Sequence, residues 1–175
     1  MKCLTKQECV QWCAARSIEE AGKSLLRWRD ATFVSDIKVP KNTLQALALS
    51  YAILSREDDS EFQGSLLWMT DWGFWSEELE QLGINIWKAL RAYYGEKREL
   101  NETPGHLFHS KEFQEQHCLF SLPLIFQWDA YLIPEPGDYM LVLSHHGVIS
   151  LVANTPKRLE RLERYWSSWN PKRKQ

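Results

Sequence analysis

Long apolar segments are missing from this chain of 175 residues. Nowhere does it hold the roughly eighteen consecutive apolar residues that a membrane-spanning helix requires. Its first residues, Met1 to Glu8, also lack the apolar core of a signal peptide. These absences exclude a membrane-embedded protein from the expected classes, and they predict a cytoplasmic location without membrane association.

Sequence motifs of well-known enzymes are missing as well. The chain contains no glycine-rich phosphate loop, no Gly-x-Ser-x-Gly turn, no His-Glu-x-x-His pair and no paired Cys-x-x-Cys knuckles. Each of these motifs would have indicated a nucleotide, a nucleophile or a zinc ion. Without them the sequence identifies no catalytic centre, and we expect no bound cofactor.

Cysteine is scarce, with four residues at positions 3, 9, 13 and 118. A chain of this length that lacks an export signal is expected to keep its thiols reduced. Cys9 and Cys13 share one face of a predicted helix, so a metal site completed by a distant ligand is an alternative. We interpret them instead as small buried apolar residues and predict no metal site.

Charge is distributed unevenly along the chain. Residues 155–175 hold seven Lys or Arg residues and two Glu residues, a local charge of +5, whereas the whole chain carries −2. The acidic remainder argues against nucleic-acid binding, which requires a basic stripe through the fold. Pairs such as Glu160 and Arg164, four residues apart, explain much of the basic pattern as a solvated helix face. Residues 171–175 are predicted to form a frayed basic tail.

Two short helices are predicted at the amino-terminal end. Thr5 with Glu8 and Ser17 with Glu20 each match the capping box, in which side chains satisfy the first backbone N–H groups of a helix. The first helix is predicted to end near Arg16 and the second near Trp28. Neither has a basic face, so a DNA-binding pair of helices is not indicated.

The remainder of the chain alternates between strand and helix patterns. We predict helices over 42–54, 76–95, 110–122 and 155–170, the third closed by Pro123, and strands over 31–39, 65–70, 129–133, 139–144 and 148–153. The expected fold is a single α+β domain spanning 1–170. It contains a mixed or mainly antiparallel sheet of about five strands covered by helices, and an amphipathic carboxy-terminal helix.

An aromatic segment follows the strand predicted at 65–70. Residues 68–75 read Trp-Met-Thr-Asp-Trp-Gly-Phe-Trp, and such rings can stack on a ligand or insert into a partner protein. Packing is the structural alternative, because nine tryptophans in one chain must mostly be buried. The candidate binding residues are Trp72, Phe74 and Trp75.

Histidine and aspartate supply a second set of candidates. A metal site or acid–base chemistry would use Asp71 together with His106, His109, His145 or His146. Their spacing is not diagnostic, since residues three apart in an extended segment point to opposite faces. Turn and surface roles are the alternative for all of them.

Two functions are therefore carried forward. The favoured hypothesis is a non-catalytic module that binds another protein, of the adaptor or toxin-neutralising kind. The alternative is a small metal-dependent or His/Asp-based hydrolase, which requires Asp71, His106, His109 and either His145 or His146 to converge within about 10 Å. The sequence does not specify the strand order, the oligomeric state or the partner.

Overall fold

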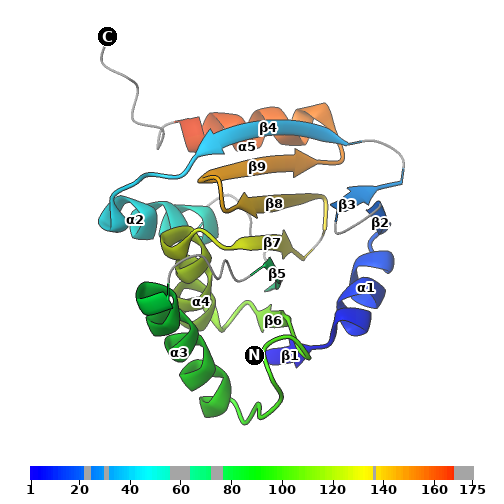
Figure 1. Ribbon diagram of the computed structural model, residues 1–175. Coiled ribbons are helices and arrows are strands. Elements are labelled where there is room, and N and C mark those ends of the chain that lie inside the picture. Colours follow the sequence, from blue (N-terminus) through cyan, green and yellow to red (C-terminus); the bar gives the residue numbers. More distant parts are fainter. Residues whose placement is uncertain (22–24, 30–31, 56–63, 72–76, 136, 168–175) are drawn as a thin grey trace.

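A seven-stranded antiparallel sheet forms the centre of the molecule, in the order β1-β6-β5-β7-β8-β9-β4. The computed structural model describes residues 1–21, 25–29, 32–55, 64–71, 77–135 and 137–167 (Figure 1). In sheet order the strands are β1 (Lys2–Leu4), β6 (Gly105–His109), β5 (Gly64–Asp71), β7 (Asp129–Pro134), β8 (Tyr139–Ser144), β9 (Val148–Ala153) and β4 (Phe33–Lys38). The α+β class and the antiparallel pairing are confirmed.

Strand β5 lies in the interior of the sheet, and its apolar side chains pack against both faces. Leu66 and Trp68 point to one face, and Leu67 and Met69 point to the other. All four side chains are buried. A strand that is apolar at every position needs a covering layer on each side, and both layers are present here.

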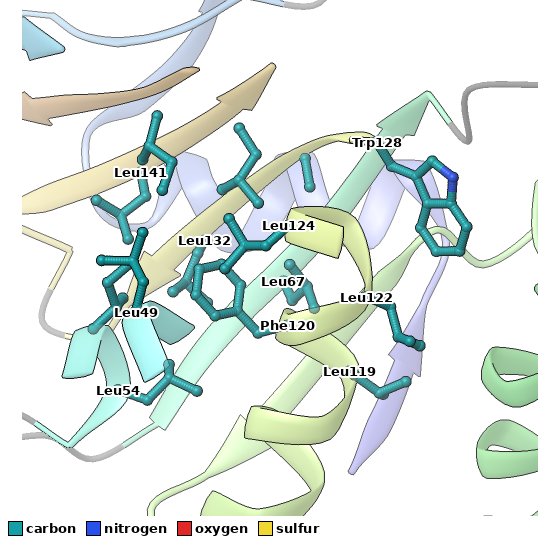
Figure 2. Packing of buried hydrophobic residues seen from close by; sticks show 14 of the residues in the cluster. Leu49, Leu54, Leu67, Leu119, Phe120, Leu122, Leu124, Trp128, Leu132 and Leu141 are labelled. Carbon is teal, nitrogen blue, oxygen red and sulfur yellow. The ribbon is translucent and has the colours of Figure 1, made fainter. Parts of the chain in front are cut away.

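Four helices cover one face: α2 (Thr43–Leu54), α3 (Glu77–Tyr93), α4 (Phe113–Phe126) and α5 (Pro156–Ser167). Figure 2 shows leucines of α2 and α4 gathered with Phe120 above strand residues Leu67, Leu132 and Leu141. Trp87 of α3 and Trp166 of α5 belong to the same buried cluster. Tryptophan therefore serves chiefly as core packing in this layer.

The opposite face is covered at one end by α1 (Lys6–Ala14) and by a separate two-stranded sheet, β2 (Ile18–Ala21) and β3 (Leu25–Trp28). Cys9 and Cys13 of α1 pack there as small buried side chains. The indole N–H of Trp28 donates to the carbonyl of Gly137 at 3.0 Å, which ties β3 to the turn before β8. Figure 1 shows α1 on the flank away from α2, α3 and α4.

The predicted helix over 17–28 is wrong, because residues 18–21 and 25–28 form the strands β2 and β3. Ser17 has a positive φ of 60°, which is not the extended conformation of a helix N-cap residue. Ile18, Leu26 and Trp28 are buried, and in β3 the exposed Arg27 lies between the two buried side chains. Alternation buries one face of a strand, and this tertiary contact outweighs the four-residue capping signature. The Thr5–Glu8 capping box is confirmed.

Two further details differ from the prediction. The main sheet has seven strands instead of about five, because β1 and β6 are short and carry little apolar periodicity. Helix α4 also continues through Pro123 to Phe126, and it is capped by Gln127, whose φ is 56°. Burial of Leu119, Phe120, Leu122 and Leu124 compensates for the hydrogen bond that Pro123 cannot donate. Among the described residues, no helix combines the length and apolarity needed to cross a membrane.

Candidate functional site

The five predicted His and Asp candidates do not gather in one place. In the antiparallel pairing of β5 with β6, His109 lies opposite Gly64, at the start of β5, whereas Asp71 ends the same strand. Seven residues of extended chain separate the two positions by about 23 Å. In the part of the chain that the structure describes, no three His, Cys, Asp or Glu side chains are placed to hold a metal ion.

His106 is fully buried beneath the helical layer. Its Nε2 accepts a hydrogen bond from the indole N–H of Trp87 at 3.0 Å. Burial, assisted by the nearby Arg91 guanidinium, lowers the pKa of His106 to about 3. A histidine that stays neutral across the physiological range inside a core has a structural role, and it is not placed to exchange protons with a substrate.

One end of the sheet brings together Asp71, His145 and His146. Asp129, which the sequence did not indicate as a candidate, lies there as well. A bulge at Thr70 shifts the register so that Asp71 lies opposite Asp129 of β7. Asp129 accepts the backbone N–H of His145 at 2.6 Å, and its two carboxylate oxygens each lie 3.0 Å from His145 Nδ1. The His146 ring lies beside that of His145, with 4.0 Å between ring centroids.

A pocket of about 180 Å³ opens beside this end of β5, on the face covered by α1 and the β2–β3 sheet. The rings of Trp68 and Tyr131 form its aromatic wall, with centroids 6.4 Å apart and an angle of 50° between their planes. Thr70 and Asn101 are exposed lining residues. The lining is completed by Lys6, Glu20, Leu26, Met69 and Pro104.

Local structure explains how the pocket residues are positioned. The capping box starts α1 at Thr5, so Lys6 occupies the first helical residue, and its Nζ lies 3.3 Å from Glu20 Oε1. Leu26 lies opposite Glu20 in the β2–β3 pairing, and its backbone N–H donates to Tyr131 Oη at 3.4 Å. The two-stranded sheet is thereby linked both to α1 and to the main sheet, with the pocket between them.

The sequence predicted only part of the pocket. Trp68 and Asp71 belong to the aromatic segment that the sequence indicated, and Trp68 lines the pocket. Trp72, Phe74 and Trp75 lie outside the described residues. No sequence pattern indicated Lys6, Glu20 or Tyr131 as pocket residues, because they come from three elements that only the tertiary structure brings together.

The basic residues of α5 form a surface separate from this pocket. Arg158 bonds to Asp138 at 2.9 Å and lies over the Tyr139 ring, so it holds the helix to β8. The tail predicted at 171–175 lies outside the described residues. No family model, curated protein or solved structure matches this chain, so the argument about function rests on the site itself.

Proposed function

We propose that this protein is a non-catalytic binding module whose pocket, between β5, β7 and the β2–β3 sheet, receives one side chain of a partner protein. The size of the pocket carries the proposal. Its volume of about 180 Å³ is close to the roughly 150 Å³ cavity that holds one benzene ring. It is smaller than the roughly 300 Å³ at which drug-sized ligand pockets begin.

The lining of the pocket supports the same function. Protein interfaces concentrate their binding energy in a few side chains that fill such pockets, surrounded by a polar rim. Here Trp68 and Tyr131 supply the aromatic wall, and the exposed side chains of Lys6, Thr70 and Asn101 lie at its edge. An adaptor or toxin-neutralising protein would use a surface of this kind.

A hydrolytic function is less well supported by the geometry. The Asp129–His145 pair resembles an oriented base, but Asp129 also accepts the backbone N–H of the same histidine. This double contact is expected of a carboxylate that fixes the turn between β8 and β9. Of the four candidate histidines, His106 is buried and His109 lies at the opposite end of β5.

Filling the pocket tests the proposal. Asn101→Trp places a large ring at the edge of the pocket, and we expect it to abolish binding of a stoichiometric partner that the wild-type protein captures from cell extract. Asn85→Trp is the matched control, because Asn85 is exposed on α3, away from the pocket. Calorimetry with the purified partner would measure both affinities. An Asn101→Trp protein that folds and binds like the control would contradict the proposal.

A further inference from the structure

Two carboxylates lie near the aromatic wall of the pocket. Glu20 lines it, and Asp129 lies two residues before Tyr131, on the same face of β7. The pKa of Tyr131 is raised chiefly by burial, is lowered by the hydrogen bond from Leu26, and is raised further by the charges of Asp129 and Glu20. Carboxylates beside an aromatic ring favour a positively charged ligand group.

Lys6, the one cation among the described lining residues, can be displaced. Lys6 has 64% of its side chain exposed, and Glu20 has 32% exposed. Ion pairs between solvent-exposed side chains contribute little to stability, because water already solvates both charges. A cation supplied from outside can therefore replace Lys6 beside Glu20 without disturbing the fold.

The same chain shows elsewhere how such a group is held. The guanidinium carbon of Arg16 lies 3.6 Å from the centroid of the Trp12 ring. Arg16 also pairs with the carboxylate of Glu135. A flat guanidinium thus stacks on an indole ring and donates to an acid at the same time, which an ammonium group does less well. The pocket offers the equivalent set of groups in Trp68, Tyr131 and Glu20.

We propose that the side chain received by the pocket is an arginine of the partner, stacked against Trp68 or Tyr131 and paired with Glu20. This inference rests on the proposed function and names the chemistry of its ligand. The oxygens of Thr70 and Asn101 supply further acceptors for the remaining guanidinium N–H groups. A neutral aromatic or acidic side chain would form no ion pair with Glu20 and could not exchange with Lys6 there.

Nuclear magnetic resonance titration of the ¹⁵N-labelled protein tests the inference without knowledge of the partner. The probes are the N-acetyl amides of arginine, lysine, norleucine and aspartate. We expect the arginine probe to cause saturable shifts at the backbone amides of Leu26, Thr70 and Asn101. It should bind at least about fivefold more tightly than each of the other three probes, as expected for a stacked and charge-paired guanidinium.

Charge variants then separate the specific contact from general electrostatics. Glu20→Gln should lower the affinity for the arginine probe by roughly three- to tenfold. Lys6→Met should raise that affinity by roughly two- to threefold. Glu19→Gln and Lys2→Met are the matched controls. Glu19 is the preceding residue on β2 and pairs with Arg27, and Lys2 pairs with Glu8. Both controls should bind the probe like the wild-type protein.

The inference would be overturned by equal binding of the norleucine, lysine or aspartate probe, by the absence of any arginine shift, or by a Glu20→Gln protein with unchanged affinity. These outcomes differ from failure of the proposed function. If Asn101→Trp abolishes the partner complex while the arginine probe has no effect, the pocket binds a protein through another side chain. If Asn101→Trp leaves the complex intact, the proposed function itself fails.

Discussion

Trp87, Arg91 and His106 form a polar group inside the helical layer, where most neighbours are apolar. Arg91 donates to the carbonyl oxygens of Thr103 and Arg98 at 2.9 and 3.0 Å, and so fixes the segment between α3 and β6. The Nε2 atom of His106 accepts from Trp87, which places the imidazole proton on Nδ1. Nδ1 has no hydrogen-bond partner among the described residues. Burial and the nearby Arg91 guanidinium keep the ring in its neutral form.

This histidine should make stability depend on pH. Its pKa is about 3 in the folded protein and about 6.5 in the unfolded chain, so the unfolded chain binds the proton first as the pH falls. The stability that the neutral ring contributes is complete above pH 6.5 and is lost as the pH falls toward 3. Between pH 7.5 and 5 we expect a loss of about 2 kcal/mol, which His106→Gln should remove.

Urea unfolding at the two pH values would measure this effect. His109→Gln is the control, because His109 is exposed on the same strand. It should retain the pH dependence that is attributed to His106. A His106→Gln protein that loses as much stability as the wild type between pH 7.5 and 5 would show that other groups titrate instead.

At the scale of elements, α3 and α4 approach closely where α3 has a glycine. A Cβ atom added to Gly83 would lie 2.6 Å from the ring of Phe126, which in turn stacks on Trp128 at 5.3 Å between centroids. Glycine normally weakens a helix, by up to about 1 kcal/mol relative to alanine. Here the missing side chain permits the contact between the two helices.

Gly83→Ala should consequently destabilise the protein despite its higher helix propensity. We expect a loss of about 1–3 kcal/mol, the usual range for overpacking in a core, as measured by chemical denaturation. Asn85→Ala, an exposed position on the same helix, should be neutral or slightly stabilising. Adding Phe126→Leu to the Gly83→Ala protein should recover part of the loss, and independent effects of the two changes would argue against this contact.

At the scale of the whole molecule, the two faces of the sheet are covered differently. Four helices cover one face, whereas α1 and the β2–β3 sheet cover part of the other. At the edge, β4 pairs with β9, and Val34, Asp36 and Lys38 on it are exposed. Strand β5 has neighbours on both sides and buried residues on both faces.

Rates of amide hydrogen exchange should differ between the interior strands and the edge strand β4. We expect the hydrogen-bonded amides of β5 and β7 to exchange at least about 100-fold more slowly than those of β4, because opening the interior strands exposes both cores. Exchange monitored by mass spectrometry or magnetic resonance would measure the two rates. Equal protection of β4 and β5 would indicate that the sheet opens only as one unit.

The helices and strands that the sequence predicted correctly are marked by short local patterns, each only a few residues long. The capping box at Thr5 starts α1, and the apolar runs at 65–70 and 139–144 become β5 and β8. The 17–28 segment was misread because the same residues fit a helix start and a pair of short strands. Only the burial of Ile18, Leu26 and Trp28 against the main sheet distinguished the two.

By itself, the sequence determined the α+β class, most of the elements and the aromatic character of the segment that follows β5. Tertiary structure alone decided that His109 and Asp71 lie at opposite ends of β5, and that Lys6, Glu20, Trp68 and Tyr131 surround one pocket. The physical reason is the range of the interactions. Caps and periodicity act between neighbouring residues, whereas a pocket depends on strand order and register, which are set by contacts between residues far apart in the chain.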